Sequence, residues 1–269
     1  MSRIVAVGDN VVDCYPALEQ MFPGGNCLNV AVLACRAGAQ TGYVGAIGRD
    51  DAGRAIEAAL AAEGVDVTHL RTPGGQTAYC VIGHQGADRI FLRADLGVSR
   101  FEPSESDFAF VDDFDAVHVG QSSGLDAHLE RFARKSRLSY DFSTRRDTAH
   151  RATVAPHCFL ASISGGDLSR EEGLQMVKQV IAGGASWCLL TRGEKGAMLA
   201  SKSAVFEIPA APTIVVDTLG AGDTFIAWTL TGLLHGNAPQ DILSAAALAA
   251  ANTCTRMGAL GHGAPMSIG

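Results

Sequence analysis

Short apolar runs alternate with amphipathic segments along most of the chain. The first run, "RIVAVG" (3–8), is rich in β-branched residues and predicts a buried strand, and the segment 25–38 predicts a helix that ends at Gly38. Such alternation is typical of a mostly parallel sheet covered by helices. The same pattern predicts further strands at 41–48, 67–70, 116–120, 138–142, 157–163 and 186–193, and helices at 51–63, near 126–137, at 169–182, near 221–235 and at 239–255.

The pattern changes between residues 74 and 97. Two strand-like runs, "TAYCVIGH" and "RIFLRAD", are joined by "QGAD" and predict a β-hairpin. We expect it to stand off the body, because a hairpin inserted into an α/β chain does not easily join a parallel sheet. A second strand pair is predicted at 196–201 and 204–210. No repeat or linker interrupts the pattern, so we expect a single domain over residues 1–269.

Composition narrows the class of protein. Hydrophobic residues make up 47% and charged residues 18% of the 269 residues, an ordinary globular balance. The net charge of -7 argues against a nucleic acid or a membrane as a partner. The seven scattered cysteines, with no CxxC pair, predict reduced thiols in a cytoplasmic protein. The N-terminal apolar run is too short for a signal peptide. No apolar run in the sequence approaches the roughly 20 residues of a membrane span.

One segment combines a helix start with an acid. Gly220-Ala221-Gly222-Asp223 opens a predicted helix, whose first N–H groups can bind an anion. Asp223 could be an ordinary first-turn acid, because the helix dipole favours one there. A bound anion beside it would need an intervening cation, proton or hydroxyl. In a phosphoryl transfer the glycine-rich turn would hold the phosphoryl group, while Asp223 takes the proton of the acceptor hydroxyl.

Four segments resemble the PfkB or ribokinase family of carbohydrate kinases, in the family's order. "DTLGAGDTF" (217–225) is similar to its C-terminal signature, and residues 24–53 resemble its N-terminal one, GGxxxNxA followed by G-x-D-x-x-G. "LTRGEKGA" (190–197) resembles the nucleotide-side segment, and "AAANTCTRMGA" (249–259) resembles the adenine-side helix. Within the family, residues 8–32 look most like the kinases that phosphorylate fructoselysine.

The resemblance implies a fold and an activity. The implied fold is a ribokinase-like three-layer α/β/α arrangement, with a mostly parallel central sheet and a small protruding β lid near 11–22 and 74–97. The implied enzyme uses ATP and Mg²⁺, with K⁺ as a further expected ion. A homodimer through the lid is also expected.

The resemblance assigns roles to individual residues. Asp223 falls on the catalytic base, and Gly220, Ala221 and Gly222 fall on its anion hole. The sugar-binding positions are Asp13, Gly25, Asn26, Asn29, Asp9 and, in the hairpin, Arg89. The nucleotide-binding positions are Thr191, Gly193, Gly196 and Asn252, and those of the monovalent cation are Asp217 and Leu219.

Plainer interpretations stay open for several of these residues. Asp217 could cap a turn after a strand, and Asp9 could do the same. Asn29 could be a polar residue on an exposed helix face. Arg89 could be a solvated charge of the hairpin.

One family segment is missing. Its NxxE sequence, which helps to place Mg²⁺ through water, corresponds here to "ASISGGDLSR" (161–170). Asp167 is the nearest acid, but its spacing differs. We therefore expect the phosphates of ATP and water to hold Mg²⁺.

The leading hypothesis is ATP-dependent phosphorylation of a sugar or sugar-amine hydroxyl, with the 6-hydroxyl of fructoselysine or a related fructosamine as the best candidate. The alternatives are a kinase for another sugar, such as a ketohexose or ribose, a nucleoside kinase, and a catalytically weak sugar-binding regulator. A dinucleotide-binding oxidoreductase is excluded, because "VGDNVVD" lacks the GxGxxG turn expected after the first strand.

Overall fold

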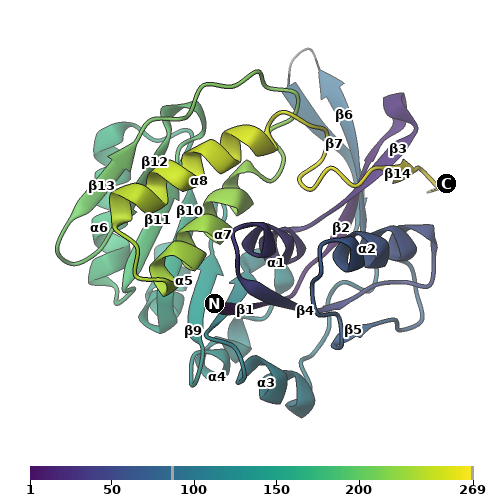
Figure 1. Cartoon of the computed structure of the whole chain (residues 1–269), viewed down its shortest axis with the longest axis horizontal. Coiled ribbons are helices and arrows are strands. Elements are labelled where there is room, and N and C mark those ends of the chain that lie inside the picture. The colour runs from purple at the N-terminus through teal and green to yellow at the C-terminus, as the bar shows by residue number, and fades with distance from the viewer. Residues whose placement is uncertain (86–87, 268–269) are drawn as a thin grey trace.

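Two β-sheets organise the chain (Figure 1). The computed structural model describes residues 1–85 and 88–267, and within these ranges the side chains of residues 84–85 and 88–91 are not described. The larger sheet has the strand order β13-β12-β11-β10-β9-β8-β1-β4-β5, and the smaller one has the order β14-β3-β2-β6-β7. The strands are β1 (Arg3–Val7), β2 (Val11–Tyr15), β3 (Gln20–Gly24), β4 (Gln40–Ala46), β5 (Leu70–Arg71), β6 (Tyr79–Gln85), β7 (Asp88–Asp95), β8 (Ala116–Gly120), β9 (Arg137–Asp141), β10 (Cys158–Ser164), β11 (Trp187–Thr191), β12 (Ala197–Ala200), β13 (Val205–Ile208) and β14 (Ala264–Pro265).

Helices cover both faces of the larger sheet. Alternate residues of β1 enter two separate hydrophobic cores, Ile4 and Ala6 on one face and Val5 and Val7 on the other. Helices α1 (Asn26–Arg36), α2 (Asp51–Ala62), α7 (Ala221–Leu234) and α8 (Pro239–Thr253) pack on the first core, and α3 (Glu105–Val111), α4 (Leu129–Phe132), α5 (Thr148–Val154) and α6 (Arg170–Ala182) on the second. Short 3₁₀ turns lie at Pro16–Leu18, Gln121–Ser123, Asp126–His128, Ala155–His157 and Gly193–Lys195.

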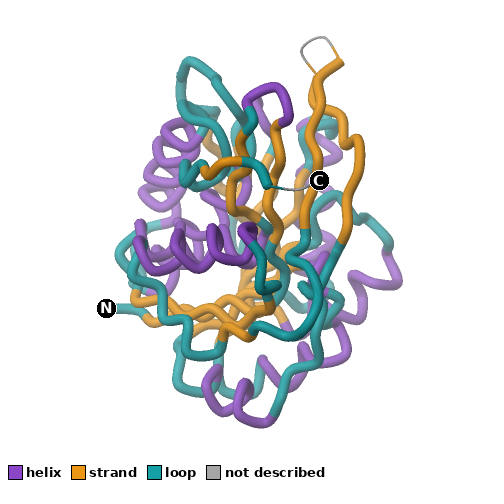
Figure 2. Tube along the Cα trace, turned by 90° about the vertical axis from the view of Figure 1, so that its right-hand side faces the viewer, coloured by secondary structure: helices purple, strands orange, loops and turns teal. Residues whose placement is uncertain are grey.

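The predicted three-layer α/β/α fold is confirmed. All neighbouring strands from β11 to β5 in the larger sheet pair in parallel, and β12 is antiparallel to both of its neighbours. The predicted hairpin is also present as β6 and β7, and it joins β2 and β3 in the smaller sheet, which stands beside the body (Figure 2). Among the described residues, none of the helices combines the length and apolar character of a membrane span.

Two predicted elements are wrong in extent. The strand expected at 67–70 is reduced to β5, because both the N–H and the hydroxyl of Thr68 bind Asp66 Oδ1 and turn the chain. The helix expected near 126–137 is a 3₁₀ turn followed by the single turn α4. It ends early because the Ser136 hydroxyl donates to the Val111 carbonyl and the chain enters β9.

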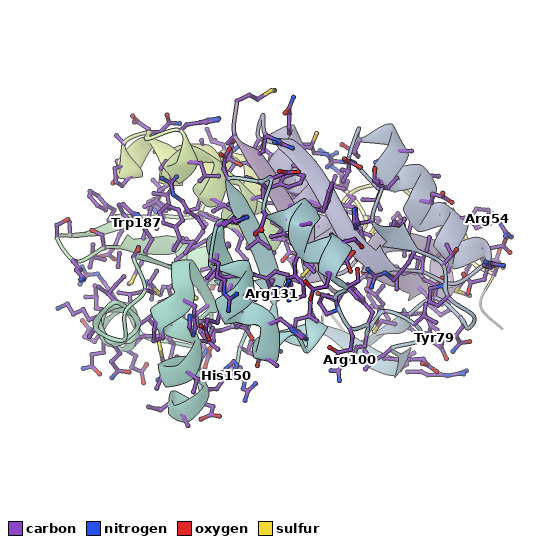
Figure 3. All side chains as sticks on the ribbon, turned by 90° about the horizontal axis from the view of Figure 1, so that it is seen from below. Arg54, Tyr79, Arg100, Arg131, His150 and Trp187 are labelled. Carbon is purple, nitrogen blue, oxygen red and sulfur yellow. The ribbon has the colours of Figure 1, made fainter. Side chains whose placement is uncertain are left out.

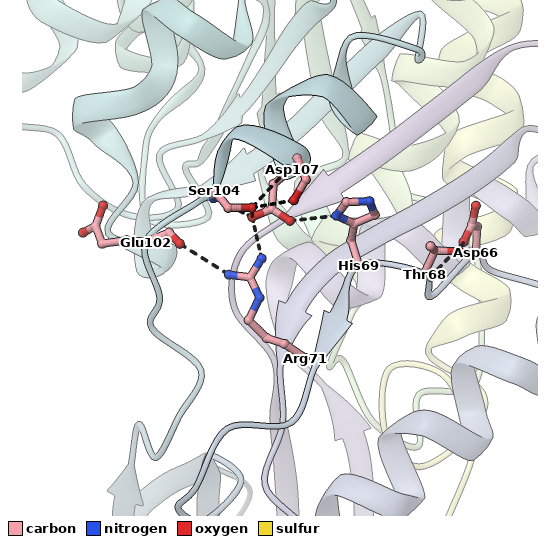
Figure 4. A network of polar contacts seen from close by, with 8 residues as sticks. Asp66, Thr68, His69, Arg71, Glu102, Ser104 and Asp107 are labelled. Atoms are coloured by element: carbon pink, nitrogen blue, oxygen red, sulfur yellow. Dashed lines mark hydrogen bonds and ion pairs between the residues drawn. The ribbon is translucent and has the colours of Figure 1, made fainter.

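A buried carboxylate ties β5 to α3 (Figure 4). Asp107 accepts hydrogen bonds from the N–H of Ser104, the N-cap residue of α3, at 2.6 Å and from Arg71 at 2.5 Å, and lies 2.8 Å from His69 Nδ1. Burial alone would raise the pKa of Asp107, but these hydrogen bonds outweigh it and lower the pKa to about 2. Asp107 is therefore ionised at neutral pH.

The G-x-D-x-x-G segment anchors the base of the hairpin. Asp50 caps α2 by accepting from the Gly53 N–H, and it also accepts from the N–H and the hydroxyl of Thr77, just before β6. A Cβ atom on Gly53 would lie 2.1 Å from the Gly48 carbonyl oxygen. Packing therefore explains Gly53 of this segment, and the capping of α2 explains Asp50.

Candidate active site

The candidate site lies where the parallel strands of the larger sheet end and two helices begin. Asp141 ends β9 and Thr191 ends β11, so both lie at the carboxyl edge of the sheet, where open α/β sheets bind ligands. Helices α1 and α7 both start at this edge. The first residue of α1, Asn26, donates to Asp223 in the first turn of α7, with Nδ2 2.8 Å from Oδ1.

Both carboxylate oxygens of Asp223 accept hydrogen bonds from amides. Asn26 binds Oδ1, and Asn29 Nδ2 lies 2.7 Å from Oδ2. Burial raises the pKa of Asp223 to about 6, and the nearby charge of Asp9 acts in the same direction, while the two amide hydrogen bonds act against it. A carboxylate with this pKa is ionised at neutral pH and can still accept a proton.

The turn before α7 can be built only with glycine. Gly220 has φ 77°, and a Cβ atom on it would lie 2.5 Å from the Ala259 Cβ. As the N-cap residue it offers no side chain to the first N–H groups of α7, which leaves them open to an anion. Beside this turn is a cavity of about 370 Å³, lined by Asp141, Ser143, Ser162, Ile163, Ser164, Thr191, Thr218, Leu219, Gly220, Gly222, Asp223 and Ile226.

Asp141 is a site residue that sequence reasoning missed. Its Oδ2 lies 3.0 Å from Asn26 Nδ2, so one amide group bridges Asp141 and Asp223. Burial raises the pKa of Asp141 to about 7, the Ser143 N–H acts against this shift, and the charges of Asp223 and Asp9 add to it. Its place at the carboxyl end of a predicted parallel strand was the signal that could have found it.

Asp13 and Asn29 come together as expected from the sequence. Asp13 lies on β2 and is 5% exposed, and Asn29 on α1 is 3% exposed, which rules out an exposed helix face for Asn29. A Cβ atom on Gly24 would lie 2.6 Å from Asp13 Oδ2 and 3.8 Å from Asn29 Oδ1. Asn29 Oδ1 is buried without a hydrogen-bond partner among the described residues. The pair therefore offers acceptor oxygens next to Asp223.

The structure gives Asp9 a capping position. Its carboxylate accepts from the N–H groups of Asn26 at 3.0 Å and Cys27 at 3.4 Å, and from the Ser123 hydroxyl at 2.9 Å. Gly25, the N-cap residue of α1 with φ 105°, has no side chain for this task. A contact of Asp9 or Gly25 with sugar stays a prediction. Arg89 lies in β7, and its side chain is outside the described residues.

A second, more apolar cavity of about 520 Å³ adjoins the first. Most of the predicted nucleotide-side residues line it, but Asn252 does not: it is exposed, and its Oδ1 accepts from Arg256. The predicted adenine-side position of Asn252 is thus not supported by where its side chain lies. The lining residues are Ser164, Thr191, Gly193, Glu194, Gly196, Ala210, Ala211, Thr213, Val215, Thr218, Ala221, Gly222, Phe225, Ala247, Ala250, Ala251 and Cys254.

The predicted cation residues have protein partners. Asp217 Oδ1 accepts from the Leu219 N–H at 3.0 Å, and its Oδ2 accepts from the Tyr15 hydroxyl at 2.8 Å and the Gly258 N–H at 3.1 Å. The carboxylate therefore joins β2, in the smaller sheet, to the loop before α7. Whether this loop binds a monovalent cation stays a prediction.

The lining of the 370 Å³ cavity fits a hydrated Mg²⁺ ion. It presents oxygen atoms, and Ser162 Oγ is buried without a hydrogen-bond partner among the described residues. Asp167 is held elsewhere, with its Oδ2 2.7 Å from Arg146 Nη1. Within the described ranges, no group of three His, Cys, Asp or Glu side chains could hold a metal ion directly.

Comparison with known proteins gives the family of the chain. The family described as "pfkB family carbohydrate kinase" matches residues 1–139 and 158–265. The chain is 38% identical to a fructosamine kinase of Bacillus subtilis over 99% of this chain and 95% of that protein, and 36% identical to a fructoselysine 6-kinase of Escherichia coli over 93% and 97%.

Solved structures show the same fold. The ribokinase of Arabidopsis thaliana, solved with ribose and ATP, superposes with a TM-score of 0.84 at 20% identity, covering 97% of this chain and 95% of that one. A fructokinase of Vibrio cholerae, solved with fructose, ADP and potassium, gives a TM-score of 0.77 at 24% identity, with coverage of 97% and 94%. The family resemblance that the sequence motifs indicated is confirmed, and the chain belongs to the PfkB family of carbohydrate kinases.

Proposed function

We propose that the protein transfers the γ-phosphoryl group of ATP to the 6-hydroxyl of fructoselysine or a related fructosamine. The observation that carries the proposal is the position of Asp223. It lies at the glycine-rich start of α7, and Asn29, which also faces Asp13, holds its carboxylate. A hydroxyl bound by Asp13 and Asn29 would lie between an anion-binding helix start and a proton acceptor.

Each residue has a defined part in the proposed transfer. Asp13 and Asn29 orient the sugar hydroxyl, and Asp223 accepts its proton as the acceptor oxygen bonds to the γ-phosphorus and the bond to the β-phosphate oxygen breaks, which releases ADP. The N–H groups after Gly220 bind the transferring phosphoryl group. Mg²⁺, when bound with ATP, would neutralise phosphate charge. The serine hydroxyls and Asp141 of the 370 Å³ cavity would hold it through water.

The acidic character of the site favours a substrate with an amine. Asp9, Asp13, Asp141 and Asp223 gather around the start of α1, as the contacts of Asn26 and Gly24 show. A fructosamine carries an ammonium group, which this field attracts. The two most similar relatives compared above are kinases for substrates of this kind.

The lid is suited to two further tasks, the exclusion of water and the formation of a dimer. A sheet beside the acceptor site can exclude water, which would suppress hydrolysis of ATP. Leu92 and Leu96 on and after β7 are 59% and 54% exposed, and a second copy of the lid would cover them. Light scattering of the protein, compared with a Leu92→Lys, Leu96→Lys double variant, tests this: a dimer that persists in the variant would contradict a contact through these residues.

A substrate screen tests the proposed function. Purified protein with ATP, Mg²⁺ and K⁺ is supplied with fructoselysine, a second fructosamine, fructose, ribose or a nucleoside, and ADP release and ³¹P NMR of the product are measured. We expect the largest kcat/KM with a fructosamine and a phosphate on the 6-oxygen. A larger kcat/KM with fructose, ribose or a nucleoside would assign the substrate to that class. Sugar binding without ADP release would favour a catalytically weak sugar-binding regulator.

A further inference from the structure

A buried histidine lies directly behind the amide that bridges the two carboxylates. His118 on β8 has no exposed surface. Its Nε2 is 3.0 Å from Asn26 Oδ1, and its Nδ1 is 2.9 Å from the Ser139 hydroxyl. A hydrogen-bonded row thus runs from Ser139 on β9 through His118 and Asn26 to Asp223 and Asp141.

The chemistry of the row fixes the direction of each hydrogen bond. The ionised carboxylate of Asp223 only accepts, so the Asn26 NH₂ group must face Asp223, and its oxygen must face His118. The same NH₂ group also reaches Asp141. An amide oxygen also only accepts, so His118 donates from Nε2, and Nδ1 accepts from Ser139. Burial lowers the pKa of His118 to about 3, which keeps it neutral with a single N–H.

The absence of a side chain at Gly120 leaves space for the Asn26 side-chain oxygen. A Cβ atom on Gly120, at the end of β8, would lie 2.2 Å from Asn26 Oδ1. Gly120 therefore lets the amide approach the strand closely enough to meet His118. The amide is held on one side by the strand and on the other by two acids.

We propose that His118 and Asn26 are positioning residues for the phosphoryl transfer, because His118 fixes the Asn26 amide so that its NH₂ group separates Asp141 from Asp223 and keeps Asp223 ready to accept a proton. This rests on the proposed role of Asp223. Without the amide, Asp223 would lose one of its two side-chain hydrogen bonds, and its protonated form, which cannot accept the proton of the hydroxyl, would be favoured.

The sign of the expected pH effect follows from the groups around Asp223. Asp9 brings negative charge and favours its protonated form, whereas the amides of Asn26 and Asn29 favour its ionised form. Asp141 takes up its own proton at a higher pH, because its pKa is about 7. His118 is neutral and carries no charge of its own to the site. Loss of the Asn26 hydrogen bond therefore raises the pKa of Asp223, and the acid limb of the kcat profile moves to higher pH.

The test is the pH dependence of kcat, measured with saturating ATP and sugar for the whole protein and three variants. His118→Leu and Asn26→Ala should each move the acid limb up by about 1–2 pH units, the effect of losing one hydrogen bond to a charged group. Each should lower kcat at pH 6 by about tenfold, with the KM for ATP unchanged. His118→Gln, whose amide N–H can take the place of Nε2–H, should restore the wild-type limb.

A matched control separates positioning from stability. His150 on α5 (Figure 3) is also buried, and its Nε2 binds Asp126 on the other face of the sheet. His150→Leu should lower the unfolding midpoint and leave the acid limb in place. If His118→Leu fails to fold, Asn26→Ala carries the same test.

Two results would overturn the proposal. One is an acid limb at the wild-type pH in folded His118→Leu or in Asn26→Ala. The other is an acid limb of His118→Gln that lies at the same pH as that of His118→Leu. The Asp223→Asn variant separates a failure of the positioning role from a failure of the proposed function. If Asp223→Asn is inactive while the limb of Asn26→Ala is unchanged, the positioning role fails alone; if Asp223→Asn is active, the proposed role of Asp223 fails.

Discussion

Asn29 connects the two halves of the site. Its amide nitrogen holds Asp223, and its oxygen faces Asp13 across Gly24. The family resemblance predicted only contacts with sugar for this residue. The structure adds a contact with the acid that we propose as the proton acceptor. Asn29 can thus bind the acceptor hydroxyl and set the acid beside it.

Asp13→Ala should weaken sugar binding much more than ATP binding. The variant loses a hydrogen bond between a charged group and a sugar hydroxyl, which corresponds to a loss of about 10- to 100-fold in affinity. Isothermal titration calorimetry with the sugar, and separately with a non-hydrolysable ATP analogue, measures both. An equal loss of both affinities would remove Asp13 from the sugar site.

At the scale of elements, the connection between α3 and β5 depends on the carboxylate of Asp107. The folded pKa of Asp107 is lowered to about 2 against an ordinary value of 3.8. Because the pKa is depressed on folding, the stabilisation is complete above the unfolded pKa and is lost as pH falls through the folded one. We estimate it at about 2 kcal/mol at neutral pH.

Asp107→Asn should therefore lower the urea midpoint at pH 7, and the difference from wild type should fall to about half at pH 3. Asp51→Asn is the control, because its exposed ion pair with Arg54 should contribute at most a few tenths of a kcal/mol. A deficit of the same size at both pH values would show that the ionised carboxylate is not the source of stability.

The sequence predicted the elements whose pattern is long and regular. Helices α7 and α8 begin at the predicted residues, and β8 covers the predicted range. It missed α3, although Ser104 and Asp107 have the spacing of a capping box, because that helix has only seven residues. It also missed β14, which has two residues and forms only by pairing with β3.

The motifs predicted which residues lie close together, but they missed residues that only tertiary contacts bring to the candidate site. Asp13, Asn29 and Asp223 are brought together as the motifs indicated. His118 lies in an apolar run and resembles an ordinary core residue in the sequence. Its contact with Asn26 arises from the packing of α1 against β8, which no local pattern encodes.

At the scale of the whole molecule, two cavities meet beside Asp223. The polar cavity of about 370 Å³ and the more apolar one of about 520 Å³ share Ser164, Thr191, Thr218 and Gly222. A nucleotide in the second would therefore place its phosphates toward the first. Tyr15 on β2 joins the smaller sheet to the loop before α7.

Turnover by Asp223→Asn tests the central claim most directly. The variant keeps the shape of the side chain and removes the proton acceptor. We predict that kcat for ADP release with a fructosamine falls by roughly 10²–10⁴-fold, while calorimetry shows that ATP and sugar still bind. Turnover near that of the wild type would contradict the account.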